Sequence, residues 1–324
     1  MKTFLFACVA LWSALRMAVP MAWAAPADGT IVSREAVVFP TAQEMARFRA
    51  ADPPYAKAVE TLHMQAITYW SDGLKIKGML AIPNGPGPFP AIVYNRGGNL
   101  EFAGLTPRSF AARAAMFVQA GYVVVGSDYR GNGGGEGREE FGGADVDDVM
   151  SLFPLLHKEP KVDGKRIGMY GSSRGGLMTY EVLARTRELK AAVVESGLSD
   201  SFQTVKDRPS MESGVYRLLV PGFAEHRDAA LRARSPVLWA DKLCRTTPIL
   251  VLHGTADWRV GPHDALAMSR ALLDAKIPFR LVMFEGGSHG NEEFADEQEQ
   301  MEIAWFNRYL RDGARLPNLV PHGE

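Results

Sequence analysis

One short stretch decides the fold: MYGSSRGGL, Met169–Leu177, which carries the pattern G-x-S-x-G around Ser173. It follows a β-rich run, Arg166–Tyr170, and opens a helical run, Leu177–Arg185. A strand, a sharp turn and a helix in this order are the setting of a nucleophile elbow. Glycines beside the serine let helix and strand approach while the serine is held on a strained turn. The pattern assigns Ser173, not Ser172, as the nucleophile.

A serine hydroxyl is a weak nucleophile at neutral pH, so a base must accept its proton and an acid must orient that base. Asp257 follows the apolar run Ile249–Leu252, and His289 lies in the glycine-rich loop Gly286–Gly290. Both loops come after predicted strands, at the edge of an α/β sheet where ligand sites gather. The sequence therefore predicts a catalytic triad of Ser173, Asp257 and His289.

Two other residues compete for these roles. His253 is an alternative base, although it closes a strand before a turn, where a structural histidine is expected. Asp264 is an alternative acid, although it is placed to cap the start of a helix. Asp257 could itself be a helix cap near Pro262, and His289 a surface loop residue.

Acyl transfer also needs preorganised donors for the developing oxyanion. One donor is expected from the backbone N–H of Arg174, the residue after the nucleophile. The second should come from the loop that follows the apolar run Ala91–Tyr94. There the candidates are the backbone N–H of Gly97 and the side chain of Arg96, with a plain turn as the alternative.

Strand-like and helix-like runs alternate along residues 63–324. A turn signal at Ser71–Gly73 predicts a first hairpin, and later strands are continuous apolar runs typical of a buried parallel sheet. This alternation predicts an α/β protein, with a mostly parallel central sheet and helices on both faces. The order Ser, Asp, His along the chain is that of the α/β-hydrolase fold. Residues 200–240 show no clean period and are predicted to be a small cap insertion.

Residues 1–24 are predicted to be a signal peptide. Lys2 precedes the apolar run Phe4–Trp12, and Ala22–Ala24 has a small-x-small cleavage pattern. The apolar run is shorter than the roughly 20 residues of a membrane span, which disfavours an anchor as the alternative. We therefore expect an exported protein, periplasmic or secreted, with no stable membrane span after removal of the signal. Residues 25–62 would then form an N-terminal extension.

Composition limits the function further. The chain of 324 residues has a formal net charge of −1 and no long basic run, so we expect no nucleic-acid partner. Loss of residues 1–24 leaves Cys244 alone, so no intrachain disulfide can form. Neither H-E-x-x-H nor a cysteine pair indicates a metal, and Gly131–Gly137 lacks the spacing of a phosphate loop. We expect no metal and no cofactor, and a small molecule or a short peptide as substrate.

Segments around these residues match the pattern of one family. They are Ser127–Gly133, Val162–Gly176, Ser235-Pro236, Pro248–Asp257, Val260–Pro262 and Gly286–Gly290. Together they resemble the catalytic domain of the prolyl oligopeptidase family of serine peptidases, over about residues 65–312. Carried over residue by residue, the resemblance implies Ser173 as nucleophile, Asp257 as acid and His289 as base.

Departures from that family leave the substrate open. The family usually carries a β-propeller before the catalytic domain, whereas only about 40 residues lie between the predicted signal and the first hairpin. We therefore expect no propeller to restrict entry. The family commonly has histidine or tyrosine where this chain has Arg96, and tyrosine or an apolar residue where it has Arg174.

These observations predict a serine hydrolase that works through an acyl-enzyme. The resemblance favours a peptidase. An open site would also suit a carboxylic ester hydrolase acting on small acyl esters, sugar esters or lactones. A third possibility is a catalytically silent binding protein in which Arg96 and Arg174 form an anion receptor. The sequence leaves the oligomeric state open.

Overall fold

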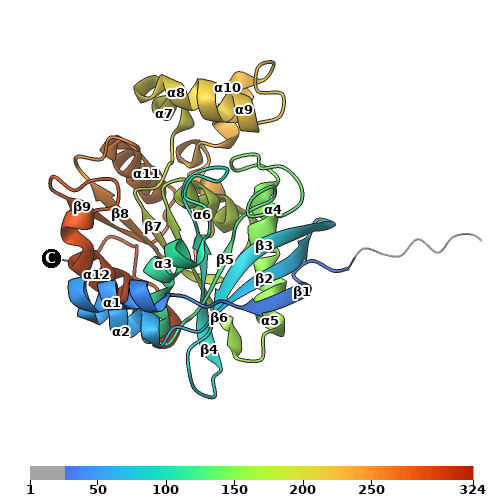
Figure 1. Cartoon of the computed structure of the whole chain (residues 1–324). Coiled ribbons are helices and arrows are strands. Elements are labelled where there is room, and N and C mark those ends of the chain that lie inside the picture. The colour runs from blue at the N-terminus through green and yellow to red at the C-terminus, as the bar shows by residue number, and fades with distance from the viewer. Residues whose placement is uncertain (1–25, 324) are drawn as a thin grey trace, which may run out of the picture.

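The structure, a computed structural model, describes residues 26–323, and in that part of the chain it contains one nine-stranded sheet (Figure 1). The strand order is β1-β2-β3-β5-β4-β6-β7-β8-β9, with parallel pairing from β5 to β9 and antiparallel pairing before it. The mostly parallel sheet is therefore confirmed. The strands are β1 (Ile31–Ala36), β2 (Met64–Ser71), β3 (Leu74–Ala81), β4 (Phe89–Asn95), β5 (Val123–Ser127), β6 (Val162–Ser172), β7 (Leu189–Glu195), β8 (Ile249–Gly254) and β9 (Phe279–Phe284).

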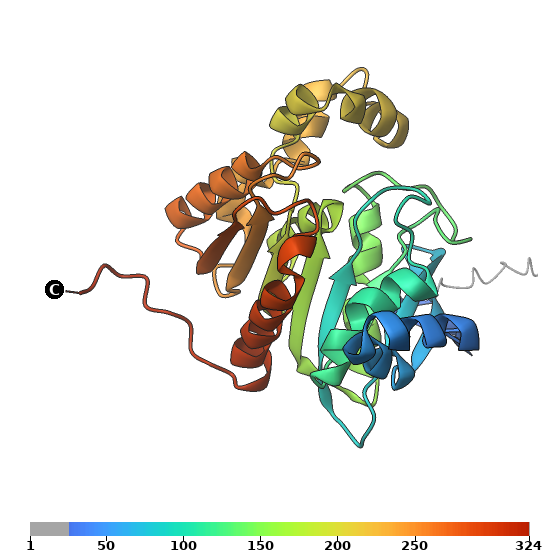
Figure 2. The ribbon, with the colours of Figure 1, turned by 60° about the vertical axis from the view of Figure 1, so that its left-hand side comes forward.

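The central strands are buried on both faces, because neighbouring side chains of a strand point to opposite sides of the sheet. On β4, Val93 packs into one apolar core and Ile92 into the other, and Val251 and Leu250 divide β8 in the same way. Helices cover both faces, as predicted (Figure 2). One core includes α4 (Asp145–Met150), α5 (Leu152–Lys158), α6 (Arg174–Arg185) and α11 (Pro262–Asp274); the other includes α2 (Pro53–Glu60), α3 (Pro107–Gln119) and α12 (Ala295–Phe306).

The start of the described chain is more than an extension. Strand β1 pairs antiparallel with β2 and forms the edge of the sheet, while α1 (Ala42–Ala51) and α2 pack against each other and α2 contacts α3. The sequence of β1, IVSREA, is mostly exposed and lacks an apolar run, so it gave no strand signal. The predicted hairpin is confirmed: Asp72 and Gly73, with φ of 51° and 72°, join β2 to β3. The predicted signal peptide, residues 1–24, lies outside the described residues.

Residues 200–240, predicted as an insertion, form a group of short helices that we call the cap. The chain enters the cap after β7 and returns to the sheet at β8, and the cap stands above the sheet in both views (Figure 1, Figure 2). Its apolar core joins Tyr216 and Leu231 to Leu177 of α6. No helix here is long enough to show a period. The helices are α7 (Ser201–Asp207), α8 (Pro209–Met211), η1 (Glu212–Tyr216), α9 (Arg217–Leu219), α10 (Arg227–Ala233) and η2 (Pro236–Leu238).

Between residues 26 and 323, the structure contains no helix with the length and apolar character needed to cross a membrane.

Candidate active site

Ser173 occupies a strained turn between β6 and α6. Its φ of 58° and ψ of −120° lie in a region that residues with a side chain rarely adopt. Its backbone N–H donates to the carbonyl of Glu195 on β7 over 2.9 Å, which fixes the turn to the sheet. A Cβ on Gly175 would lie 2.0 Å from the carbonyl oxygen of Asn95, and one on Gly171 would lie 2.1 Å from that of Gly175. Both glycines are thus required by close backbone contact.

Asp257 and His289, from the loops after β8 and β9, are hydrogen-bonded. His289 Nδ1 lies 2.8 Å from Asp257 Oδ2. The other carboxylate oxygen of Asp257 accepts the backbone N–H groups of Arg259, at 2.8 Å, and Val260, at 3.1 Å. Burial alone would raise the pKa of Asp257, but hydrogen bonds from His253 and His289 hold it well below its ordinary value. An ionised Asp257 accepts the Nδ1 proton and leaves Nε2 of His289 free as a base.

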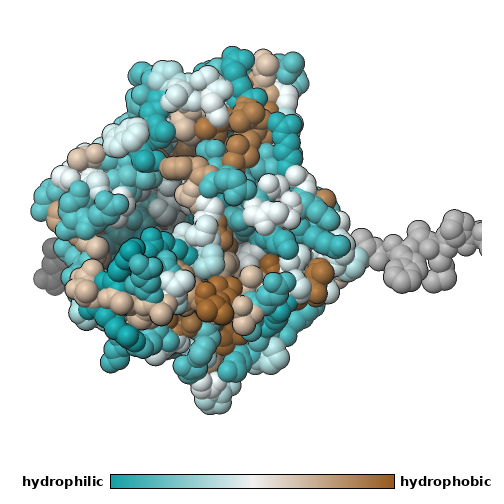
Figure 3. All heavy atoms as spheres, in the orientation of Figure 1, coloured by the Kyte–Doolittle hydropathy of each residue, from teal (hydrophilic) through white to brown (hydrophobic). Residues whose placement is uncertain are grey.

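Ser173 and His289 line one cavity of about 430 Å³. The surface is hollowed beneath the cap in the space-filling view (Figure 3). No hydrogen bond joins the Ser173 hydroxyl to the His289 ring in this structure. Such bonds are often long in unliganded enzymes and tighten when substrate binds. The structure therefore brings the three predicted triad residues to one site, with the acid–base pair already formed.

The two competing residues take structural positions. His253 is fully buried, and its Nε2 lies 2.9 Å from the carbonyl oxygen of Val260 and 3.3 Å from Asp257 Oδ2. Asp264 accepts the backbone N–H groups of Ser199 and Asp200, both at 2.8 Å, and so ties α11 to the chain leaving β7. Asp257, rather than Asp264, is the carboxylate that contacts His289.

The two backbone positions predicted to bind the oxyanion lie beside Ser173. The N–H of Arg174 is the first of helix α6 and has no partner within the helix. A Cβ built on Gly97 would lie 3.2 Å from Ser173 Cβ and 3.8 Å from its Oγ, so the Gly97 backbone is packed against the serine. Both residues line the cavity.

The side chain of Arg96 is not a donor to the site, which corrects the sequence-based prediction. It is 1% exposed and does not line the cavity. Its Nε lies 2.8 Å from Asp128 Oδ1, and its Nη2 donates to the carbonyls of Leu100, at 3.2 Å, and Asp128, at 2.9 Å. The guanidinium holds the loop that carries Gly97, so its charge and donors are already used.

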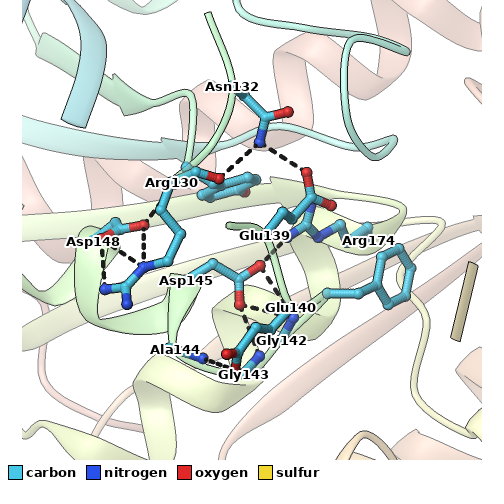
Figure 4. A network of polar contacts seen from close by, with 12 residues as sticks. Arg130, Asn132, Glu139, Glu140, Gly142, Gly143, Ala144, Asp145, Asp148 and Arg174 are labelled. Carbon is cyan, nitrogen blue, oxygen red and sulfur yellow. Dashed lines mark hydrogen bonds and ion pairs between the residues drawn. The ribbon is translucent and has the colours of Figure 1, made fainter. Parts of the chain in front are cut away.

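The side chain of Arg174 is likewise engaged inside the protein. Its guanidinium pairs with Glu139 and Asp145 and lies 4.5 Å from the Tyr129 ring centroid (Figure 4). Asp145 also accepts the N–H of Gly143 at 2.7 Å. With both guanidiniums neutralised, the anion receptor considered from the sequence has no basis in Arg96 and Arg174.

The charged residues of the cavity itself were not predicted from the sequence. Arg113, Glu195 and Tyr170 form part of its lining, with Arg113 Nη2 3.3 Å from Glu195 Oε2 and the tyrosine hydroxyl donating to the same carboxylate. Arg208 of the cap and Arg259 also line it. Arg259 stands two residues after Asp257, a proximity that could have marked it. The position of Arg208 depends on how the cap folds.

No metal site accompanies these groups: among residues 26–323, no cluster of three or more His, Cys, Asp or Glu side chains is arranged to hold an ion. Cys244 is a free, buried thiol away from the cavity.

Comparison with known proteins gives concordant matches. Residues 108–313 match the Prolyl oligopeptidase family. The peptidase YtmA of Bacillus subtilis is 31% identical over 229 residues, which is 70% of this chain and 86% of that protein. A puromycin-hydrolyzing peptidase of Mycobacterium tuberculosis is 26% identical with a TM-score of 0.62, over 74% of this chain and 38% of that one. The acylaminoacyl peptidase of Pyrococcus horikoshii shares the fold, with a TM-score of 0.69 and 22% identity over 80% of this chain and 43% of that one. The chain thus spans less than half of either solved protein.

Proposed function

The chain belongs to the prolyl oligopeptidase family, whose catalytic domain has the α/β-hydrolase fold, and we propose that it is a serine peptidase in which Ser173, His289 and Asp257 carry the chemistry. The observation that supports these roles best is the 2.8 Å contact between His289 Nδ1 and Asp257 Oδ2, in the same cavity as the strained Ser173. Peptide substrates are favoured because the matched relatives are named as peptidases.

The proposed reaction proceeds in two halves. His289 Nε2 takes the proton of Ser173 as Oγ bonds to the substrate carbonyl carbon, and the oxyanion is stabilised by the backbone N–H groups of Arg174 and Gly97. His289 then gives the proton to the leaving nitrogen, the carbon–nitrogen bond breaks, and an acyl-enzyme remains. Water gives a proton to His289 and bonds to the acyl carbon. Ser173 then leaves with that proton.

A fluorophosphonate probe tests the nucleophile. We expect stoichiometric labelling of the wild type and of the matched control Ser172→Ala, and none of Ser173→Ala. Labelling that survives in Ser173→Ala would show that another residue is the nucleophile. Absence of labelling in the wild type as well would favour a silent pocket.

Paired substrates test the bond. Aminoacyl and acyl-peptide p-nitroanilides should be hydrolysed beside p-nitrophenyl acetate and butyrate, with all turnover lost in Ser173→Ala. The ester hydrolase considered from the sequence predicts a different result, namely turnover of the esters with no cleavage of any amide. That result would overturn the peptidase assignment.

We also propose that residues 1–24 direct export, on the strength of Lys2, the apolar run and the Ala22–Ala24 pattern. The chain expressed at full length should be recovered from the periplasm or the medium with Ala25 as its first residue. N-terminal sequencing and fractionation measure both properties. A cytoplasmic protein that retains Met1 would contradict the proposal.

A further inference from the structure

Two arginines line the active-site cavity without a carboxylate partner. Arg208 follows α7 in the cap, and Arg259 lies in the loop that carries Asp257. Within residues 26–323, no carboxylate oxygen lies within 4.0 Å of either guanidinium. This sets them apart from Arg96, Arg113 and Arg174, whose charges are each paired nearby.

The contacts of the two arginines leave donors available. Arg208 Nη1 donates to the backbone carbonyl of Arg259 over 2.6 Å, which holds the Arg208 side chain of the cap beside the loop that carries Arg259. The Arg259 guanidinium lies 5.1 Å from the Trp258 ring centroid and 5.7 Å from that of Phe102. Both rings are largely exposed, at 69% and 61%. Aromatic faces hold a guanidinium in place but accept none of its in-plane N–H donors.

The surrounding charges favour an anion between the arginines. Burial and the charge of Arg259 both lower the pKa of Arg208, against the opposing effect of Asp257. Asp257 is itself occupied by His289 and backbone N–H groups, and the neighbouring Asp207 carboxylate lies 3.1 Å from Nε2 of His263. A carboxylate bound by both guanidiniums would relieve their mutual repulsion and fill their free donors, since the planar fork of arginine matches a carboxylate.

We propose that Arg208 and Arg259 form a subsite for a carboxylate of the substrate, so that the enzyme selects acidic peptides. The apolar lining of the same cavity, which includes Phe141, Leu198 and Met211, would hold the chain between this carboxylate and Ser173. Glu292 also lines the cavity and is exposed. Its charge disfavours a second carboxylate there. The inference rests on the proposed function for its link to catalysis, but the binding it requires can be measured without turnover.

Calorimetry on Ser173→Ala separates binding from chemistry. The ligands are N-acetyl-Ala-Glu-Ala-amide and its Gln counterpart, which differ in charge but hardly in shape. We expect the Glu peptide to bind at least about tenfold more tightly, the size of a charge-assisted hydrogen bond. In the same background, Arg208→Gln and Arg259→Gln should each bring the ratio toward one, and Arg208→Lys should keep part of it. Arg232→Gln removes a cap charge outside the cavity lining and should leave the ratio unchanged.

The possible results have distinct meanings. Equal binding of the two peptides, or a preference that survives both substitutions to Gln, would overturn the carboxylate subsite. If Arg232→Gln also abolished the preference for the Glu peptide, the preference would come from the overall positive charge of the cap. That result would overturn the carboxylate subsite too. Selective binding combined with no turnover of any amide or ester by the wild type would leave the subsite standing and refute the proposed function instead.

Discussion

The guanidinium of Arg174 lies 2.6 Å from the carboxylate of Glu139, and the two side chains are 2% and 0% exposed. Asp145, also fully buried, pairs with the same guanidinium, so a single cation serves two buried carboxylates. Arg174, the residue that follows Ser173, thus has its backbone in one environment and its side chain in another. The backbone faces the cavity, and the side chain joins α6 to the loop that carries Glu139.

Arg174→Met should therefore act on stability more than on chemistry. Loss of the cation leaves two buried carboxylates unpaired, which should lower the free energy of unfolding by about 3 to 5 kcal/mol. The backbone N–H remains, so kcat per folded molecule should fall by less than about tenfold. Denaturant unfolding and kinetics on the same samples measure both. Arg270→Met is the control, because its exposed pair with Asp274 should contribute about 1 kcal/mol or less. Native stability with abolished substrate binding would contradict this view.

Asp257→Asn should nearly abolish turnover. An amide cannot hold the Nδ1 proton of His289 as a carboxylate does, and the corresponding change in other triads lowers kcat by about 10⁴. Asp264→Asn is the matched control: it breaks contacts with Ser199 and Asp200, so it should destabilise the fold yet keep kcat within about tenfold. If Asp264→Asn proved to be the catalytically dead variant, the acid would have been assigned wrongly.

Gly97→Ala should slow the reaction without unfolding the protein. The added methyl would lie 3.2 Å from both Ser173 Cβ and the Ser172 carbonyl oxygen, which crowds the proposed nucleophile and displaces a proposed oxyanion donor. We expect kcat/KM to fall by about ten- to a hundredfold, as for other small misplacements of reacting groups. Gly214→Ala, where the methyl meets nothing within 4 Å, should leave kcat/KM unchanged. Equal kcat/KM values for the two variants would show that the backbone of Gly97 has no role in catalysis.

Glu181 should make stability depend on pH. Burial raises its pKa from 4.5 to about 7, although Arg185 lies 3.7 Å away. Between these values the folded state keeps the proton and the unfolded chain releases it, so the free energy of unfolding falls as pH rises from 4.5 to 7. Glu181→Gln should remove this loss and be about 2 to 3 kcal/mol more stable than the wild type at pH 8. Curves of stability against pH that run parallel for the two proteins would refute the shift.

Local patterns sufficed for the parts of the site that depend on neighbours in sequence. The turn that holds Ser173 is specified by five consecutive residues, Gly171–Gly175. Asp257 and His289 follow apolar strands, and a parallel sheet brings the ends of those strands to one edge. The mostly parallel sheet and the first hairpin were predictable for the same reason. Apolar runs indicate the buried parallel strands, and a turn dipeptide indicates the hairpin.

Side-chain environments set by distant residues were not predictable. From the sequence, Arg96 and Arg174 are predicted to place positive charge in the cavity. Their partners, Asp128 and Glu139, lie 32 and 35 residues away in the chain, so no local pattern reveals the pairing. Arg208 reaches the cavity only through the arrangement of cap helices too short to show a period. Strand β1 was missed because its pairing with β2, not its own composition, makes it a strand.

The cap leaves the fold after β7 and re-enters it at β8, and these two strands are neighbours in the sheet. The two ends of the cap are therefore attached to neighbouring strands. Insertions or deletions within the cap need not shift the register of any strand pair. Arg208 lies in the cap, which can change in this way, whereas Arg259 lies in the same loop as Asp257. Evolution can thus retune selectivity in one half of the proposed subsite while the residues proposed for bond cleavage stay fixed.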